Sequence, residues 1–208
     1  MATVMPVTTS LVVLLVCRAN VCRSPLAATL LRERAQQSGF ADVLLVRSAG
    51  TDAEPGVGMC EAADAWSGHR HSDHRADLLT TSMLKSADLV LAVDRENRAI
   101  CAQMVPAIRS RLFTLRQAAF LATELLIRLT AGAGLEGSPE VPSDRLSRLH
   151  WLVGEMDAAR VLLAAREGQS DDIRDQHGPD PHVVVFEEVD EATQALISAF
   201  AECLAWAG

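Results

Sequence analysis

The chain has 208 residues, of which 49% are hydrophobic and 22% charged, and this balance excludes a largely disordered protein. Its formal net charge of −8 argues against a general nucleic-acid binder, and no Lys/Arg-rich block suggests binding to a membrane surface. Because the sequence contains five Phe, three Trp and no Tyr, we expect a core built mainly from aliphatic side chains.

Strands alternate with helices along the chain. The run 11–16 is apolar throughout, which is typical of a strand buried on both faces of a parallel sheet, and Pro25 suits the first turn of a helix. In chain order, we predict strands over 11–16, 43–48, 89–93 and 112–114, and helices over 26–37, 61–66, 80–86, 95–104, 115–129, 146–165 and 183–206. This order predicts an α/β fold, a three-layer αβα arrangement around a four-stranded parallel sheet.

The cysteines do not suggest a disulfide framework. They are odd in number and irregular in spacing, and no CxxC pair indicates structural zinc. We therefore predict a reducing, cytoplasmic setting, with Cys60, Cys101 and Cys203 buried or incidental. The run 11–16 is too short to span a membrane and has no preceding Lys or Arg, so we do not interpret it as a signal peptide.

The stretch from Cys17 to Pro25 joins a buried strand to the start of a helix. Such a loop directs several backbone N–H groups at one point, and the helix dipole adds positive potential, so a tetrahedral oxyanion fits there. Cys17 opens the loop and Arg23 closes it. The positive potential favours the thiolate form of Cys17, and Arg23 is able to hold two phosphate oxygens. The pattern thus predicts a nucleophile and an electrostatic clamp for phosphoryl transfer.

This loop resembles the phosphate-binding loop C-x-G-N-x-C-R-S-P of the low-molecular-weight protein tyrosine phosphatases, with Ala19 in place of the family's Gly. Further similar segments are Arg47–Thr51, His74–Ala76 and the stretch 88–97. The likeness spans roughly residues 11–130 and 170–206. It implies a phosphatase with the phosphate-binding loop after the first strand, in a single domain over 1–208 with an insertion at 131–169.

The resemblance also implies roles for individual residues. Cys17 would be the nucleophile that forms a phosphocysteine, and Arg23 would bind phosphate in the ground and transition states. Asn20, Ser24, Ser48 and His74 would support the loop. Cys22 would be a redox partner that forms a reversible disulfide with Cys17 and protects it. The predicted phosphate-binding set is Cys17, Arg18, Ala19, Asn20, Val21, Cys22, Arg23 and Ser24.

The general acid has two candidates. Asp175 lies in a stretch that resembles the bacterial form D-I-x-D-P-x-G, except that Gln176 replaces Pro. Asp180 lies in a literal Asp-Pro pair but lacks the usual surroundings, and it is also well placed to cap the last helix. We predict Asp175 as the acid and keep Asp180 as the alternative.

The predicted reaction is hydrolysis of phosphotyrosine without metal or cofactor, because Arg23 and backbone amides supply the positive charge. Expected partners are a phosphorylated protein and free phosphate or sulfate, with no nucleic acid and no membrane span. Three alternatives remain: a protein arginine phosphatase, whose loop typically has Thr where this chain has Val21; a thiol-dependent arsenate reductase; and a catalytically weak phosphate-binding module. The predicted helix over 146–165 has an apolar face that either packs on the core or forms a dimer surface.

Overall fold

The computed structural model describes residues 9–69, 73–132, 140–166, 170–175 and 182–206. Four strands, seven α-helices and three short 3₁₀ helices are seen in these ranges. In chain order they are β1 (Leu11–Cys17), α1 (Arg23–Gln37), η1 (Ala41–Val43), β2 (Leu44–Gly50), α2 (Glu61–Trp66), α3 (Thr81–Ser86), β3 (Leu89–Ala92), α4 (Arg95–Met104), η2 (Pro106–Arg111), β4 (Leu112–Thr114), α5 (Leu115–Thr130), α6 (Arg145–Ala158), η3 (Ala159–Arg166) and α7 (His182–Ala205).

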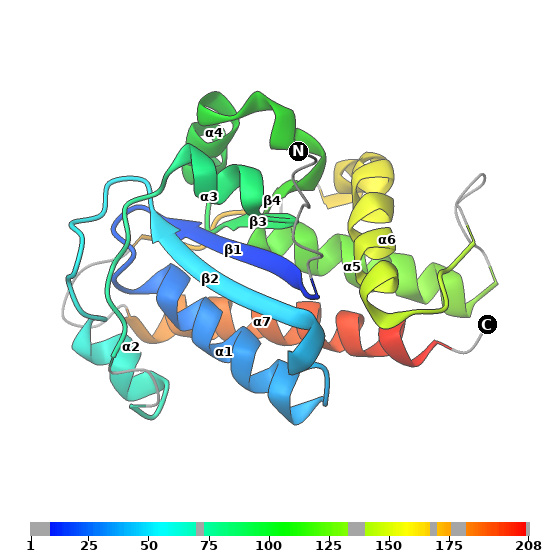
Figure 1. Cartoon of the computed structure of the whole chain (residues 1–208), viewed down its shortest axis with the longest axis horizontal. Helices are drawn as coiled ribbons and strands as arrows, with labels where there is room; N and C mark the ends of the chain where they lie inside the picture. The colour runs from blue at the N-terminus through cyan, green and yellow to red at the C-terminus, as the bar shows by residue number, and fades with distance from the viewer. Residues whose placement is uncertain (1–8, 70–72, 133–139, 167–169, 176–181, 207–208) are drawn as a thin grey trace, which may run out of the picture.

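The four strands form one parallel sheet in the order β2-β1-β3-β4. β1 is therefore central, and its carboxyl end, Cys17, lies level with Gly50 of β2. The chain order reverses between β1 and its neighbours, which is where ligand sites form in open α/β sheets. The predicted four-stranded parallel sheet is confirmed, and its switch point coincides with the loop that follows β1 (Figure 1).

Side chains of β1 alternate between two hydrophobic layers. Leu11, Val13 and Leu15 point to a layer shared with α1, α5 and α7. Leu14 and Val16 point to the opposite layer, which contains residues of α3 and α4. Figure 1 shows α1 and α7 on one side of the sheet and α3 and α4 on the other. The two-residue period of a strand thus produces the predicted three-layer arrangement.

Helix bounds follow the predicted ranges closely, with one correction. The helix predicted over 146–165 is α6 only as far as Ala158, after which the chain winds more tightly as η3. At this change Arg160 donates hydrogen bonds to the carbonyl oxygens of Arg109 and Leu112, which tie the chain to η2 and β4.

The apolar face of α6 packs on the core. Leu149 and Met156 are fully buried, and Leu146 and Leu163 pack against the same cluster. This packing accounts for the amphipathic pattern, because the face that it predicts is covered by α5 and α7 of the same chain.

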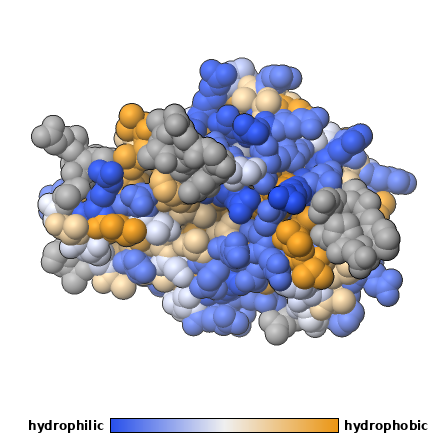
Figure 2. Space-filling model, turned by 180° about the vertical axis from the view of Figure 1, so that it is seen from behind, coloured by the Kyte–Doolittle hydropathy of each residue, from blue (hydrophilic) through white to orange (hydrophobic). Residues whose placement is uncertain are grey.

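On the face seen in Figure 2, hydrophilic side chains predominate and hydrophobic ones form separate groups. Among the described helices, none combines the length and the apolar character needed to cross a membrane.

Candidate active site

Backbone hydrogen bonds from the residues that follow β2 hold the loop between β1 and α1 in place. Thr51 donates its backbone N–H to the carbonyl of Cys17, and Asp52 donates to that of Arg18, both at 2.9 Å. Gly50 lies so close that an added Cβ would be 2.5 Å from the Arg18 carbonyl oxygen. Only glycine fits this position without moving the loop backbone.

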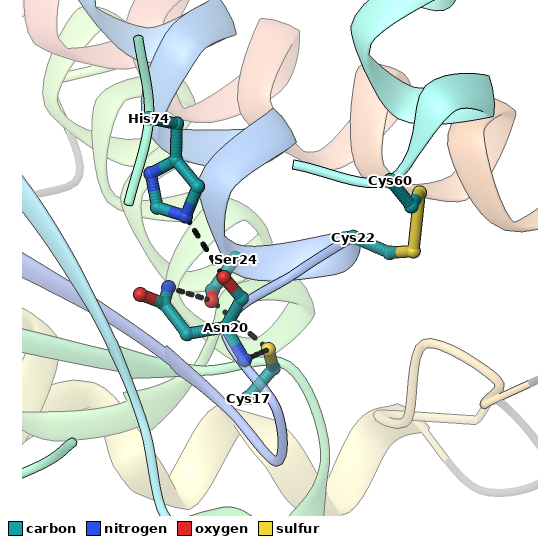
Figure 3. The surroundings of a disulfide bond; sticks show 6 residues. All are labelled: Cys17, Asn20, Cys22, Ser24, Cys60 and His74. Atoms are coloured by element: carbon teal, nitrogen blue, oxygen red, sulfur yellow. Dashed lines mark hydrogen bonds between the residues drawn. A yellow bond between two sulfur atoms is a disulfide. The ribbon is translucent and has the colours of Figure 1, made fainter. Parts of the chain in front are cut away.

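Asn20 fixes the shape of the loop from a fully buried position. Its φ of 54° is left-handed, a conformation that Asn adopts more readily than most residues. Its side-chain amide donates to Ser24 Oγ at 2.9 Å, and its Oδ1 accepts from the backbone N–H of Asp77 at 3.0 Å. His74 Nε2 lies 2.8 Å from the Asn20 carbonyl oxygen, to which it donates (Figure 3). The structure therefore brings Asn20, Ser24 and His74 together around the loop.

The Cys17 thiol is buried at the centre of this network. Its Sγ lies 2.9 Å from Ser24 Oγ and accepts the backbone N–H of Asn20 at 3.2 Å (Figure 3). Two polar hydrogens close to one sulfur stabilise a negative charge on it. The sulfur also lies next to the N-terminus of α1, whose dipole acts in the same direction. The arrangement suits a nucleophilic thiolate and a thiolate leaving group alike.

The guanidinium of Arg23 is buried and held by three groups. Nη1 donates to Asp94 Oδ2 at 3.0 Å and to the Ile173 carbonyl at 3.1 Å, while Nη2 pairs with Asp175 Oδ2 at 2.8 Å. Asp94 also accepts the backbone N–H of Asn97, which caps α4. A guanidinium fixed in this way is preorganised for an oxyanion, because little freedom is left to lose on binding.

A cavity of about 220 Å³ opens above the loop. It is lined by Cys17, Arg18, Ala19, Val21, Cys22, Arg23 and Asp175. We call it the anion pocket. Most of the predicted phosphate-binding residues thus line one cavity, while Asn20 and Ser24 support it from below. The predicted acid Asp175 borders the same cavity, whereas its alternative Asp180 lies outside the described residues.

Two sequence-based expectations for the cysteines need correction. Cys22 forms a disulfide with Cys60, with their Cα atoms 5.6 Å apart, while Cys17 is a free thiol. Cys60 is therefore not incidental, and the predicted redox partner of Cys17 is already bonded elsewhere (Figure 3). Tertiary packing brings the two cysteines together. Cys60 donates its backbone N–H to the carbonyl of Val21 at 2.9 Å, and this bond places α2 beside the loop. Cys101 and Cys203 are buried, as expected.

Ser48 is not part of the loop network. It lines a neighbouring cavity together with His74, and among the described residues no hydrogen bond joins it to the loop. The sulfurs of Cys22 and Cys60 and a ring nitrogen of His182 lie within 4.8 Å of one another. Because the two sulfurs are bonded to each other, they offer no thiolate to a metal in this state.

The sequence did not predict several backbone groups from distant segments that hold the loop and Arg23 in place. The Ile173 carbonyl, the Asp77 amide and Gly50 all act through the backbone, so their residue types give little indication of their role. Gly50 carried a signal as the glycine of the segment Arg47–Thr51, and Ile173 lies in the stretch that resembles D-I-x-D-P-x-G, whereas Asp77 lies in neither segment.

Known proteins match the part of the chain that contains the loop and the sheet. The family described as "Low molecular weight phosphotyrosine protein phosphatase" matches residues 12–124. The chain is 36% identical over 107 residues to the protein-arginine-phosphatase of Bacillus subtilis, a match that covers 50% of this chain and 70% of that one. It is 37% identical over 102 residues to low molecular weight protein-tyrosine phosphatase A of Mycobacterium tuberculosis, covering 47% of this chain and 61% of that one.

Solved structures have the same fold. The arginine phosphatase YwlE with a phosphorylated active-site serine superposes with a TM-score of 0.61 at 22% identity, covering 90% of this chain and 94% of that one. A low molecular weight protein tyrosine phosphatase from T. tengcongensis gives a TM-score of 0.60 at 22% identity, covering 91% of this chain and 99% of that one.

Proposed function

This chain belongs to the low molecular weight phosphotyrosine protein phosphatase family, and from that premise we propose that it hydrolyses phosphotyrosine in proteins through a phosphocysteine intermediate. The observation that carries the proposal is the meeting of the Cys17 thiol and the Arg23 guanidinium in one small pocket at a helix N-terminus. Nucleophile and anion clamp are the two parts that phosphoryl transfer chiefly requires.

In the first step, Cys17 Sγ attacks phosphorus and forms the S–P bond as the bond from phosphorus to the phenolic oxygen breaks. Arg23 and the loop amides carry the charge on the phosphoryl oxygens. Asp175, in its protonated form, gives its proton to the leaving oxygen. Its position on the edge of the anion pocket supports this assignment.

In the second step, water attacks the phosphocysteine. Asp175, now a carboxylate, takes a proton from this water, and the S–P bond breaks to release inorganic phosphate and the Cys17 thiolate. Ser24 Oγ, 2.9 Å from the sulfur, stabilises the thiolate as it leaves. Asn20 and His74 keep the loop in the shape that both steps need.

Protein arginine phosphatase activity is the second candidate, and the 36% identity to the Bacillus subtilis enzyme of that name supports it. Val21, which lines the anion pocket, favours the phosphotyrosine substrate, since the resemblance implies Thr at this position in arginine phosphatases. The bonded pair Cys22–Cys60 is the oxidised form of a dithiol. It would supply the two electrons of the third candidate, arsenate reduction, only after an external thiol has reduced it.

Steady-state kinetics with matched peptides test the proposal. We expect kcat/KM for a phosphotyrosine peptide to exceed that for the same peptide with phosphoarginine, and Val21→Thr to shift the ratio toward phosphoarginine. A preference for phosphoarginine in the unchanged chain would overturn the main assignment in favour of the second. Failure to hydrolyse para-nitrophenyl phosphate would overturn both and leave a phosphate-binding module.

Several wider properties are also part of the proposal. We propose a single phosphatase domain over residues 1–208 with an insertion at 131–169, acting in the cytoplasm on phosphorylated proteins without nucleic acid. Phosphate and sulfate are expected to bind the anion pocket as product and product mimic. The packing of α6 against α5 and α7 supports one domain.

A further inference from the structure

A second cavity, of about 590 Å³, lies between α4, η2 and the start of η3. None of the residues that line it lines the anion pocket. Its walls include Arg98 and Ala102 of α4, Arg109 of η2, Leu112 of β4, Asp157 of α6 and Arg160 of η3. Asp157 and Arg160 lie outside the segment 12–124 that matches the phosphatase family.

The lining carries an excess of positive charge. It has three guanidinium groups and one carboxylate, Asp157, which lies 2.6 Å from Nε of Arg160. Within the described part of the chain, neither Arg98 nor Arg109 has a carboxylate at ion-pair distance. A cavity of this kind attracts anions.

Arg98 is the least satisfied of the three. Its Nε is buried and has no hydrogen-bond partner. Burial is the main cause that lowers the pKa of Arg98, followed by repulsion from Arg160. The charge of Asp171 opposes this effect, and Arg109 adds a weaker repulsion. Arg98 thus lies close enough to Arg160 and Arg109 to be repelled by both, and a buried donor without a partner is rare in folded proteins. Both features would be relieved by an anion bound among them.

Arg160 is fixed in place for such a role. Its Nη2 donates to the carbonyl oxygens of Arg109 and Leu112 at 2.7 and 3.0 Å, and its guanidinium carbon lies 3.9 Å from the centre of the Phe113 ring. These contacts hold the charge at the wall of the cavity. Ala102 and Leu112 add an apolar surface beside the cations.

We propose that this cavity is a second binding site, which takes an organic phosphate of nucleotide size. One guanidinium group is able to bind two phosphate oxygens at once. The positive charges of Arg98 and Arg109, which have no carboxylate of the described residues at ion-pair distance, therefore suit the negative charge of a phosphate group. The volume lies in the range of small-molecule sites and is much larger than inorganic phosphate needs. The apolar wall suits the uncharged part of the ligand.

Calorimetric titration of the full chain with ADP, pyrophosphate and adenosine tests the site. We expect ADP to bind more tightly than pyrophosphate, and adenosine not to bind. The double variant Arg98→Gln/Arg109→Gln should weaken ADP at least tenfold. Arg145→Gln, which removes the same kind of charge from a distant exposed ion pair, should change it less than twofold. The single variant Arg109→Gln, at an exposed position, gives the same test if the double variant is unstable.

The anion pocket is the competing site for ADP, and the same variants separate the two. ADP binding that survives in Arg98→Gln/Arg109→Gln but disappears in Arg23→Ala would overturn the proposal, since the phosphate-binding loop would then account for it. Absence of ADP binding to the unchanged chain, or binding of adenosine as tight as that of ADP, would overturn it as well. The proposed phosphatase activity is tested separately, by the hydrolysis assays, and does not depend on the outcome of these titrations.

Discussion

The guanidinium of Arg23 and the carboxylate of Asp175 form an ion pair of 2.8 Å at the edge of the anion pocket. Arg23 is 5% exposed and Asp175 is 42% exposed, so the pair joins the buried anion clamp to a solvent-facing acid. A phosphate in the pocket competes with Asp175 for Nη2. Its binding would therefore free Asp175 to take a proton and approach the leaving oxygen.

The first prediction concerns this acid. Asp175→Asn should lower kcat for phosphotyrosine by about 10²–10⁴-fold, because a positioned proton donor typically contributes that much. Para-nitrophenyl phosphate, whose leaving group is a weaker base, should lose less. Asp180→Asn should change neither rate, because Asp175 is the proposed proton donor and borders the anion pocket. A large leaving-group-dependent loss in Asp180→Asn, with none in Asp175→Asn, would show that the Asp-Pro pair holds the acid.

The second prediction separates two roles of Asp94, which binds Arg23 and caps α4. Asp94→Asn keeps a capping side chain but removes the charge facing Arg23, so kcat/KM should fall by about tenfold or more. Asp94→Ala should lose as much activity and, in addition, about 1 kcal/mol of unfolding free energy through the lost cap. Kinetics and urea unfolding of both variants are the measurements. Equal stability of the two variants would refute the capping role.

The third prediction concerns thiol reactivity. Burial raises the pKa of Cys101 to about 12 and that of Cys203 to about 11, so both are almost fully protonated near neutral pH. Iodoacetate at about pH 7.5 should therefore modify Cys17, which lines a positively charged pocket, on the order of 10²-fold faster than either. Peptide mass spectrometry gives the rates, and added phosphate should protect Cys17. Comparable labelling of Cys101 would argue against an activated Cys17.

How far the sequence could predict this molecule depends on how local each feature is. The stretch Cys17–Pro25 is contiguous, so its strand, loop and helix start were predictable from residue order, and the apolar run 11–16 predicted the central strand. Ile173 lies in the stretch that resembles D-I-x-D-P-x-G, but that pattern did not indicate that its carbonyl accepts a hydrogen bond from Arg23. Cys60 reaches the loop only through tertiary packing, so no spacing along the chain indicated it. The same holds for the arginine-lined cavity, whose walls come from separate elements of the chain.

The fourth prediction concerns the stability that the disulfide provides. Cys22 and Cys60 are 38 positions apart, and closing a loop of that length stabilises a protein by about 4 kcal/mol in the chain-entropy model. Cys22→Ser and Cys60→Ser should each lower the free energy of unfolding by about 2–4 kcal/mol, and dithiothreitol should have the same effect on the unchanged chain. Denaturant titration measures this. A variant as stable as the unchanged chain would mean that the bond contributes nothing.

The fifth prediction follows from the fact that Cys22 cannot protect Cys17 while it is bonded to Cys60. Peroxide converts the Cys17 thiolate to a sulfenic acid, which a free neighbouring thiol captures as a disulfide with loss of water. With Cys22 occupied, Cys17 should instead oxidise further to the irreversible sulfinic acid. Cys60→Ser leaves Cys22 as a free thiol that lines the same pocket as Cys17.

We therefore expect dithiothreitol to restore more activity to peroxide-treated Cys60→Ser than to the equally treated unchanged chain. The double variant Cys22→Ser/Cys60→Ser is the matched control, because it lacks both partners and should recover no better than the unchanged chain. Mass spectrometry should detect the Cys17–Cys22 disulfide in Cys60→Ser only. If the unchanged chain, kept oxidised at Cys22–Cys60, recovers as fully as Cys60→Ser, another group protects Cys17 and the bonded pair does not limit its rescue.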